Sequence, residues 1–431
     1  MLLNHLIAAC LLVGPSDQGI GADLAAAVDL PTSKERQQAA LALSKRADVS
    51  LDDWLQAART FGEFVEHEAG IHVAAVDLQV GDKIEHTQIH YWVPESYDPK
   101  KPTPTLLALH GAGGIGLSEV QTWQNVASDL NMLIVAPTDA GANQGYSFDE
   151  REQLAALATL RWLRRKFNVD ENRIHLTGVS RGGHLCWELA LRHPQHWASL
   201  APRIGGPALA IVGGRNTIRF AANIAHIPLR LLQGMQDDAK MIVNQRLLFT
   251  RLEEVGAVDA EFVAFETLGH SYDLAAVNFV EFFGKAKRNP LLDRFTLRTL
   301  SPEHGQMYSL QIDKLDKKAV VEFQPRVDPN LWNNWGHQQK AEFIQIEADK
   351  RTGEADAIMT SPGHIQLKSK LVRKMRLLLP SEMLDEKGRI EIQYQGKTQS
   401  KKPKRDRKVL LSYFVEHFDR SFLPVCEIKL N

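Results

Sequence analysis

The chain has 431 residues, a formal net charge of −1 at pH 7 and hydrophobic residues at 44% of its positions. This length predicts two domains and allows a sizeable core. The balanced charge argues against nucleic acid or an anionic membrane surface as a partner. The cysteines Cys10, Cys186 and Cys426 are too few for a disulfide framework and belong to no His/Cys cluster, so no bound metal is expected.

The N-terminus begins with a short apolar run over residues 1–15, which small and polar residues follow. The run is too short to span a bilayer, so we predict a secretory signal peptide over residues 1–27 and no integral membrane span. It departs from the usual pattern because no Lys or Arg precedes the apolar core. Small residues at Gly21-Ala22 or Ala25-Ala26-Ala27 are the expected cleavage places. The protein is therefore expected in the periplasm, the cell envelope or the medium.

Two helices are predicted in an N-terminal segment over residues 32–67. Ser50 and Asp53 have the spacing of an N-cap and its partner at the start of the second helix. Apolar residues recur at helical spacing from Leu51 to Val65. We expect this face to pack against the main domain, and a lid over the active site is the alternative.

Alternating apolar residues from Ile71 to Val93, with a turn at Gly81-Asp82, predict an antiparallel pair of strands that leads into the main sheet. Further strands are predicted over residues 106–109 and 132–136, and a helix over 150–167. This order of strands and helices predicts a mostly parallel, doubly wound sheet. We expect the loop over 138–148 to border a substrate pocket.

A glycine-rich loop, His110-Gly111-Ala112-Gly113-Gly114, follows the wholly apolar strand at 106–109. Glycines let the backbone approach a substrate closely, and a main-chain N–H near Ala112 would be placed to hold an oxyanion. No Gly-Lys-[Ser/Thr] ends the loop, and no acidic residue is placed for a dinucleotide fingerprint. A nucleotide or other cofactor is therefore not expected.

Residues 173–191 contain an alternating apolar run, a glycine cluster and a helix-forming run, which together predict strand, sharp turn and helix. Gly178 and Gly182 flank Ser180 in a Gly-x-Ser-x-Gly pattern. Such a serine lies on a strained turn, so its neighbours must lack side chains. The helix that follows points backbone N–H groups, including that of Arg181, at the place where an oxyanion would form.

Two later loops offer an acid and a base. A strand predicted over 229–233 ends at Gly234, and Asp237 and Asp238 follow at its carboxyl end, where sites of open parallel sheets lie. These residues alone leave both aspartates as candidates. The last core strand, over 260–265, is followed by His270. Serine, acid and histidine thus occur in the chain order of the Gly-x-Ser-x-Gly hydrolases.

From about residue 290 the pattern changes to alternating runs with few helical stretches, which predicts an all-β sandwich-like accessory domain over residues 291–431. Lys397–Lys408 is strongly basic and is expected to be a solvated loop between strands rather than a polyanion site. Trp332 and Trp335 are expected as buried core aromatics, with a carbohydrate-binding face as the alternative. The alternating runs cover residues 342–347, 364–368, 389–394 and 425–430.

Over residues 71–283 the chain resembles the α/β-hydrolase superfamily. The resemblance rests on the sharp strand-to-helix turn around Ser180, which this family calls the nucleophile elbow, on the glycine-rich loop after residue 109, and on the chain order of serine, acid and histidine. The chain looks similar to secreted esterases of the polyhydroxybutyrate-depolymerase and feruloyl-esterase type, and less so to prolyl-oligopeptidase catalytic domains. The resemblance implies an α/β-hydrolase domain over residues 71–288. It favours Asp237, because the family's Gly-x-x-Asp loop matches Gly234 to Asp237.

The resemblance implies a serine hydrolase that cleaves carboxylic esters through an acyl-enzyme, without a cofactor. Ser180 would be the nucleophile, His270 the base and Asp237 the orienting acid, with N–H groups near Ala112 and at Arg181 as the oxyanion hole. Arg181 departs from many relatives in its side chain, but only its backbone is needed. A small or polymer-derived ester is the expected substrate. A serine peptidase of prolyl-oligopeptidase type and a noncatalytic binding protein on a hydrolase scaffold are the alternatives.

Overall fold

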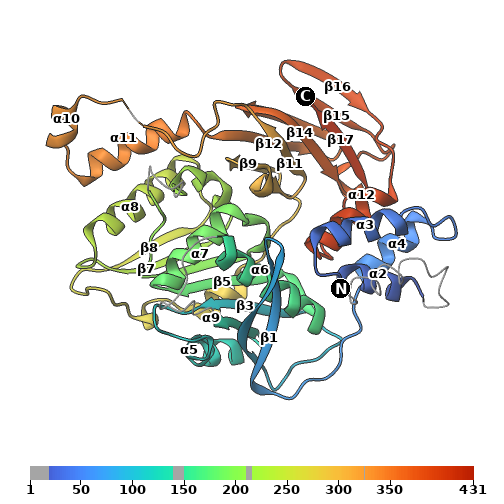
Figure 1. Ribbon diagram of the computed structural model, residues 1–431, viewed down its shortest axis with the longest axis horizontal. Helices are drawn as coiled ribbons and strands as arrows, with labels where there is room; N and C mark the ends of the chain where they lie inside the picture. Colours follow the sequence, from blue (N-terminus) through green and yellow to red (C-terminus); the bar gives the residue numbers. More distant parts are fainter. Residues whose placement is uncertain (1–18, 139–149, 210–215, 325) are drawn as a thin grey trace.

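The structure is a computed structural model that describes residues 19–138, 150–209, 216–324 and 326–431 (Figure 1). Most of the predicted signal peptide and nearly all of the predicted pocket loop at 138–148 lie outside these residues. The described chain contains a large sheet covered by helices on both faces, two smaller sheets at the C-terminal end, and a group of N-terminal helices beside them.

The large sheet has eight strands in the order β1-β2-β4-β3-β5-β6-β7-β8. The pairs β1–β2 and β2–β4 are antiparallel, and all other neighbours are parallel. This confirms the predicted hairpin and the predicted doubly wound α/β class. The strands are β1 Gly70–Val80, β2 Lys83–Val93, β3 Thr103–Leu109, β4 Leu133–Thr138, β5 Val169–Val179, β6 Ser199–Arg203, β7 Leu229–Gly234 and β8 Ala260–Phe265.

Alternate residues of the central strands enter two separate cores, as the pleat of a strand requires. On β3, Leu106 and Ala108 pack in one cluster with Trp123, whereas Leu107 and Leu109 pack in the other. Helices therefore cover both faces of the sheet. The first core includes α5 Gly116–Asp129 and α9 Phe279–Lys285, and the second includes α6 Glu150–Lys166, α7 Arg181–Arg192 and α8 Ala239–Glu254.

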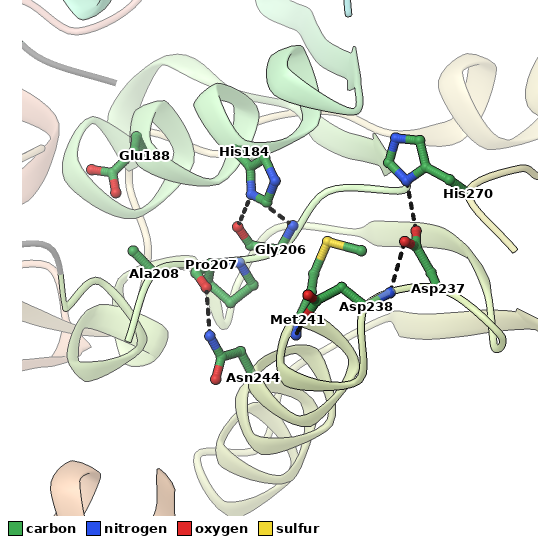
Figure 2. Close-up of a pocket in the computed structure, with 10 residues that line it drawn as sticks. All are labelled: His184, Glu188, Gly206, Pro207, Ala208, Asp237, Asp238, Met241, Asn244 and His270. Atoms are coloured by element: carbon green, nitrogen blue, oxygen red, sulfur yellow. Dashed lines mark hydrogen bonds and ion pairs between the residues drawn. The ribbon is translucent and has the colours of Figure 1, made fainter. Parts of the chain in front are cut away.

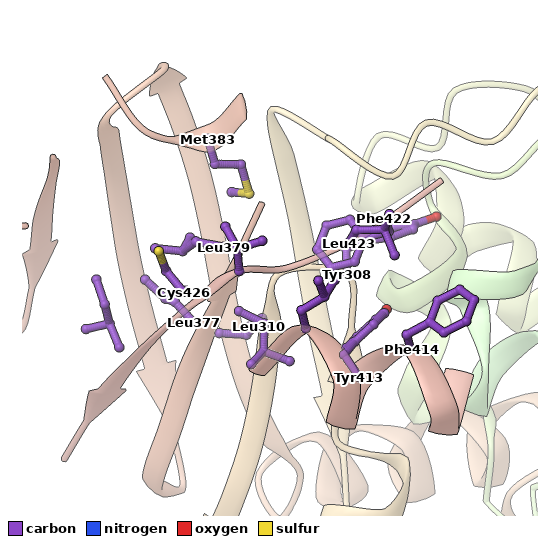
Figure 3. Packing of buried hydrophobic residues seen from close by; sticks show 14 of the residues in the cluster. Tyr308, Leu310, Leu377, Leu379, Met383, Tyr413, Phe414, Phe422, Leu423 and Cys426 are labelled. Carbon is purple, nitrogen blue, oxygen red and sulfur yellow. The ribbon is translucent and has the colours of Figure 1, made fainter. Parts of the chain in front are cut away.

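The C-terminal part folds around two further sheets, in the orders β10-β11-β14-β17 and β16-β15-β13-β12-β9. Their apolar side chains and those of α12 form one buried cluster (Figure 3). The strands are β9 Arg294–Thr299, β10 Gln306–Met307, β11 Leu310–Leu315, β12 Gly353–Ser361, β13 His364–Lys370, β14 Val372–Leu379, β15 Ile390–Tyr394, β16 Lys397–Lys401 and β17 Cys426–Leu430, and the helices are α10 Pro329–Asn334, α11 His337–Asp349 and α12 Arg407–His417. Short 3₁₀ segments occur at Pro194–His196, Ile218–Ile224, Leu274–Ala276, Pro302–His304 and Ser381–Met383.

Three expectations for this part of the chain are wrong in whole or in part. The run at 342–347 lies in α11, where residues three and four apart are buried along one helical face, so its apparent alternation was misleading. The basic stretch Lys397–Lys408 is mostly solvent-exposed as expected, but only residues 402–406 form a loop, because the stretch begins as β16 and ends in the first turn of α12. Strand β16 pairs with β15 and leaves most of its side chains exposed, so it carries no apolar pattern. Trp332 and Trp335 are not core residues. They are half-buried and pack on each other and on Phe343.

The N-terminal helices are α2 Ile20–Val28, α3 Ser33–Leu43 and α4 Leu51–Arg59. The predicted cap of α4 is confirmed, because Ser50 Oγ accepts from the Asp53 N–H at 3.1 Å and Asp53 Oδ2 accepts from the Ser50 N–H at 3.1 Å. The expectation that α4 packs on the main domain is wrong. Trp54 and Phe61 are buried in the cluster of the C-terminal sheets, and the Phe61 ring lies 5.3 Å from that of Phe414.

Helix α2 spans both predicted cleavage places. Leu24, Ala27 and Val28 are buried in the same C-terminal cluster. Cleavage at Ala25–Ala27 would therefore remove the Leu24 side chain from this core. The free energy of unfolding would fall, as it does when a buried leucine is truncated.

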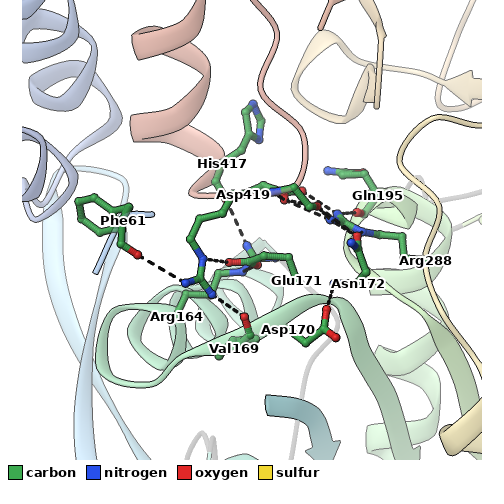
Figure 4. Close-up of polar contacts among 12 residues, drawn as sticks. Phe61, Arg164, Val169, Asp170, Glu171, Asn172, Gln195, Arg288, His417 and Asp419 are labelled. Atoms are coloured by element: carbon green, nitrogen blue, oxygen red, sulfur yellow. Dashed lines mark hydrogen bonds and ion pairs between the residues drawn. The ribbon is translucent and has the colours of Figure 1, made fainter. Parts of the chain in front are cut away.

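Buried charges join the two parts of the chain (Figure 4). Glu171 on β5 forms ion pairs with Arg164 on α6, at 2.7 Å, and with Arg420 beyond α12, at 3.0 Å. Arg288, which follows α9, pairs with Asp419. The junction between the large sheet and the C-terminal part is thus fixed by paired, desolvated groups as well as by apolar packing.

Candidate active site

Ser180 occupies the sharp turn between β5 and α7, with φ 54° and ψ −112°. This positive φ is strained for a residue with a side chain. A Cβ at Gly178 would meet the carbonyl oxygen of Gly182, and one at Gly182 would meet that of Leu109. Both flanking positions therefore require glycine, as the spacing in the sequence predicts.

His270 lies in the loop after β8 and reaches both of the other predicted residues. Its Nε2 is 2.8 Å from Ser180 Oγ, and its Nδ1 is 2.7 Å from Asp237 Oδ2. With Asp237 ionised, Nδ1–H donates to the carboxylate, which leaves Nε2 as the acceptor for the serine hydroxyl. Figure 2 shows Asp237 directed at His270 and Asp238 directed elsewhere. Asp238 instead caps α8, accepting from the backbone N–H groups of Lys240 and Met241.

Hydrogen bonds keep Asp237 ionised. Burial opposes ionisation, but donation from His270, from the Asp238 backbone N–H and from Gln233 outweighs it and lowers the pKa of Asp237 below its ordinary value. Gln233 Nε2 donates to Asp237 Oδ2 at 3.0 Å, and its own Oε1 accepts from Gln245 at 2.7 Å. Neither glutamine was predicted from the sequence. The one signal was a polar residue, Gln233, directly after the apolar pair Leu231-Leu232 of β7.

The glycine-rich loop lies against the elbow. A Cβ at Gly111 would be 3.5 Å from Ser180 Cβ and 3.4 Å from the Val179 carbonyl oxygen. Gly113 has a φ of +71°, which favours glycine, and His110 is buried with Nδ1 2.8 Å from the Gly111 carbonyl oxygen. Arg181 is the first residue of α7, so its N–H belongs to the positive end of that helix. The predicted oxyanion residues thus lie on segments that meet at Ser180.

A cavity of about 500 Å³ opens beside His270 and Asp237 (Figure 2). His184 extends into it from α7, one turn after Ser180, and Met241 and Asn244 line it from α8. His184 Nδ1 is 2.7 Å from the Gly206 carbonyl oxygen, and burial lowers the pKa of His184. Neutral His184 is therefore the expected form at pH 7. This histidine was not predicted as a site residue, although its place four residues after Ser180 on a helix was a usable signal. The remaining lining residues are Glu188, Gly206, Pro207, Ala208 and Asp238.

Across the residues that the structure describes, no group of three or more His, Cys, Asp and Glu side chains is arranged to hold a metal ion. In the same residues, every helix is too short or too polar to cross a bilayer. Cys186 and Cys426 are both buried as free thiols.

No protein-family model matches the chain. Its sequence is similar to feruloyl esterase C of Emericella nidulans, with 26% identity over 136 residues that cover 30% of this chain and 50% of that protein. A probable feruloyl esterase C of Aspergillus flavus is 24% identical over 146 residues, which cover 32% of this chain and 53% of the relative. The chain thus spans about half the length of the curated relatives it matches.

Among solved structures, a thermostable esterase is 20% identical, with a TM-score of 0.40 over 50% of this chain and 63% of that one. The strand order and parallel pairing around Ser180 define the fold here. The chain therefore has the α/β-hydrolase fold, carries a further C-terminal part built on two sheets, and is related in sequence to feruloyl esterases.

Proposed function

We propose that the protein is a serine hydrolase that cleaves carboxylic esters through an acyl-enzyme intermediate. One observation carries the proposal: Ser180 Oγ, on a strained turn, is 2.8 Å from His270 Nε2, while Nδ1 of the same ring is 2.7 Å from Asp237. A serine hydroxyl is a weak nucleophile at neutral pH unless a base lies within hydrogen-bond reach.

In the proposed reaction, Ser180 Oγ attacks the ester carbonyl carbon while its proton passes to His270 Nε2. Asp237 orients the ring and stabilises its protonated form. His270 then gives this proton to the leaving-group oxygen, so the alcohol departs and the acyl group stays on Ser180. Water then attacks the acyl-enzyme, with His270 as base again, and releases the carboxylic acid.

The oxyanion of each tetrahedral intermediate is assigned to backbone N–H groups at Ala112 and Arg181. The positive φ at Gly113 and the approach of Gly111 to the elbow support this assignment. Loss of one such donor costs about 3 kcal/mol of transition-state stabilisation in other serine hydrolases.

A carboxylic ester is favoured over a peptide because the curated relatives are named as esterases. The cavity beside His270 can hold the acyl or alcohol group of a small ester or of an ester cut from a polymer.

The direct test is labelling of the purified protein with a fluorophosphonate probe, followed by turnover of short-chain p-nitrophenyl esters. We expect an adduct on Ser180 and measurable turnover, both absent in Ser180→Ala. Ser400→Ala, in an exposed residue of β16, is the control and should label normally. A folded protein that neither labels nor turns over any ester would overturn the proposal and favour a noncatalytic binding role.

We also propose that the chain is exported and that its leader ends before Leu24. The burial of Leu24 and Ala27 supports this over cleavage at Ala25-Ala26-Ala27, which would remove Leu24 from the core. N-terminal sequencing of the protein recovered outside the cytoplasm checks it. A mature N-terminus at or beyond residue 25 would contradict it.

A further inference from the structure

Arg203 is a buried charged residue next to the proposed site. It ends β6, the neighbour of the strand that leads to Ser180, and its side chain is completely buried. The guanidinium lies 5.1 Å from the ring centroid of Trp123 and 5.4 Å from that of Tyr272, both in the range of a cation–π contact. The mechanism above does not use it.

Arg203 contacts the serine turn, the His270 loop and the helix that follows the glycine-rich loop. Its carbonyl oxygen accepts the backbone N–H of Ser180 at 2.9 Å. One Nη donates to Tyr272 Oη at 2.8 Å, and Tyr272 is two residues after His270. The other Nη pairs with Glu119, in the first turn of α5, which begins just beyond the glycine-rich loop.

The pair Arg203–Glu119 is fixed in place by its burial. Side-chain exposures are 0% and 4%, so neither charge can turn to water. Burial lowers the pKa of Arg203, but Glu119 and Tyr272 outweigh it and keep the pKa above its ordinary value. A desolvated ion pair is strongly destabilised when either partner is displaced. Arg203 therefore offers Tyr272 a donor that does not move.

His270 needs such an anchor. Its side chain is 51% exposed, and most residues from Gln236 to Asp238 and from Ser271 to Ala276 are half or fully exposed. Tyr272 and Leu274 attach this exposed loop to the apolar core on one face of the sheet, and Tyr272 also accepts a hydrogen bond from the buried Arg203. The position of the His270 loop therefore depends on a few anchoring contacts, of which this hydrogen bond is one.

We propose that Arg203 is a positioning residue that, through Tyr272, holds the His270 loop within reach of Ser180. The inference rests on the proposed function of that site. Arg203 itself touches neither the serine hydroxyl nor the imidazole.

Tyr272→Phe tests the inference because it keeps the ring beside the guanidinium and removes only the hydroxyl. We expect kcat for a p-nitrophenyl ester to fall about tenfold, with KM within about twofold of wild type, since a displaced base slows chemistry rather than binding. The rate of fluorophosphonate labelling should fall in parallel. Amide hydrogen exchange of peptides within 266–278 should become faster.

Tyr97→Phe is the matched control. Tyr97 is also half-buried, and its hydroxyl accepts one hydrogen bond, from the Asn168 N–H at 3.2 Å, away from the site. The Tyr97→Phe variant should lose about as much thermal stability as Tyr272→Phe. Its kcat and the amide hydrogen exchange of peptides within 266–278 should stay unchanged. Wild-type exchange and labelling in Tyr272→Phe would overturn the inference. Failure of wild type to label would instead overturn the proposed function, while the exchange comparison would still decide whether Tyr272 anchors the loop.

Discussion

Arg288 and Asp419 form an ion pair of 2.7 Å in which the two side chains are only 1% and 6% exposed. Arg288 follows α9, a helix that packs on the large sheet. Asp419 follows α12 of the C-terminal part (Figure 4). Ser421 and the Gln195 carbonyl oxygen accept further hydrogen bonds from the same guanidinium. Burial opposes ionisation of Asp419, but Arg288 outweighs it and holds the pKa of that carboxyl far below its usual range.

Asp419→Asn should therefore lower the free energy of unfolding by about 3–5 kcal/mol, because it leaves the Arg288 charge buried and unpaired. Urea denaturation followed by tryptophan fluorescence measures this. Asp29→Asn is the control. Asp29 pairs with Arg165 at the surface, with exposures of 48% and 36%, and its loss should cost less than about 1 kcal/mol. Equal effects of the two variants would contradict a special role for the buried pair.

Asp237→Asn and Asp238→Asn should separate the two neighbouring carboxylates. Asp237→Asn is expected to lower kcat by about 10²–10⁴-fold, because an amide can stabilise neither the required tautomer nor the protonated ring of His270. Asp238→Asn should keep wild-type kcat, since asparagine also caps helices well. Ester hydrolysis at saturating substrate measures both. The assignment fails if Asp238→Asn loses the larger share of activity.

His175 should make stability fall in acid. It lies on β5 with 1% exposure and Nδ1 2.8 Å from Ser199 Oγ, and burial followed by the nearby charge of Arg173 lowers its pKa to about 3. The unfolded chain binds this proton near pH 6.5, whereas the folded chain does not bind it until about pH 3. The stabilisation is thus complete above pH 6.5 and is lost as the pH falls through this window.

From this one group, the free energy of unfolding should decrease by about 1.4 kcal/mol per pH unit within the window. Urea titrations at pH 7, 6, 5 and 4 measure the slope. His175→Asn keeps a hydrogen-bonding group but does not titrate, so its slope should be smaller by nearly that amount. Identical slopes in the two proteins would show that folding does not lower the pKa of His175.

The sequence predicts the elbow because its requirements are local. Gly178, Ser180 and Gly182 fix one turn, and the strand and helix around them have strong patterns of their own. His270 and Asp237 are predictable because strand ends in a parallel sheet meet at one edge. Gln233, Tyr272 and Arg203 are not, because their roles arise from contacts between segments far apart in the chain.

The wrong expectations for α4 and for the C-terminal part have the same origin. The apolar face of α4 could be recognised, but nothing in it specifies whether Trp54 packs on the large sheet or on Phe414 and its neighbours. Strand β16 is held to β15 by backbone hydrogen bonds, and its side chains are mostly exposed. Such a strand needs no apolar residues, so the sequence pattern does not reveal it. Helix α11 buries Ile344 and Ala348 on one face and exposes Ile346. Buried and exposed apolar residues together give the alternating pattern that is typical of a strand.

The position of α2 to α4 against α12 has a consequence for the order of folding. The core around Trp54 and Phe61 is discontinuous in sequence, and the whole hydrolase sheet is inserted between its halves. During synthesis, residues 70–288 can complete their own core, whereas the N-terminal helices have no partner until α12 has been made. Such long-range closure is slow and leaves apolar surface open in the meantime. A chain interrupted after residue 288 would leave the apolar faces of α2 and α4 without the residues that cover them in the full chain.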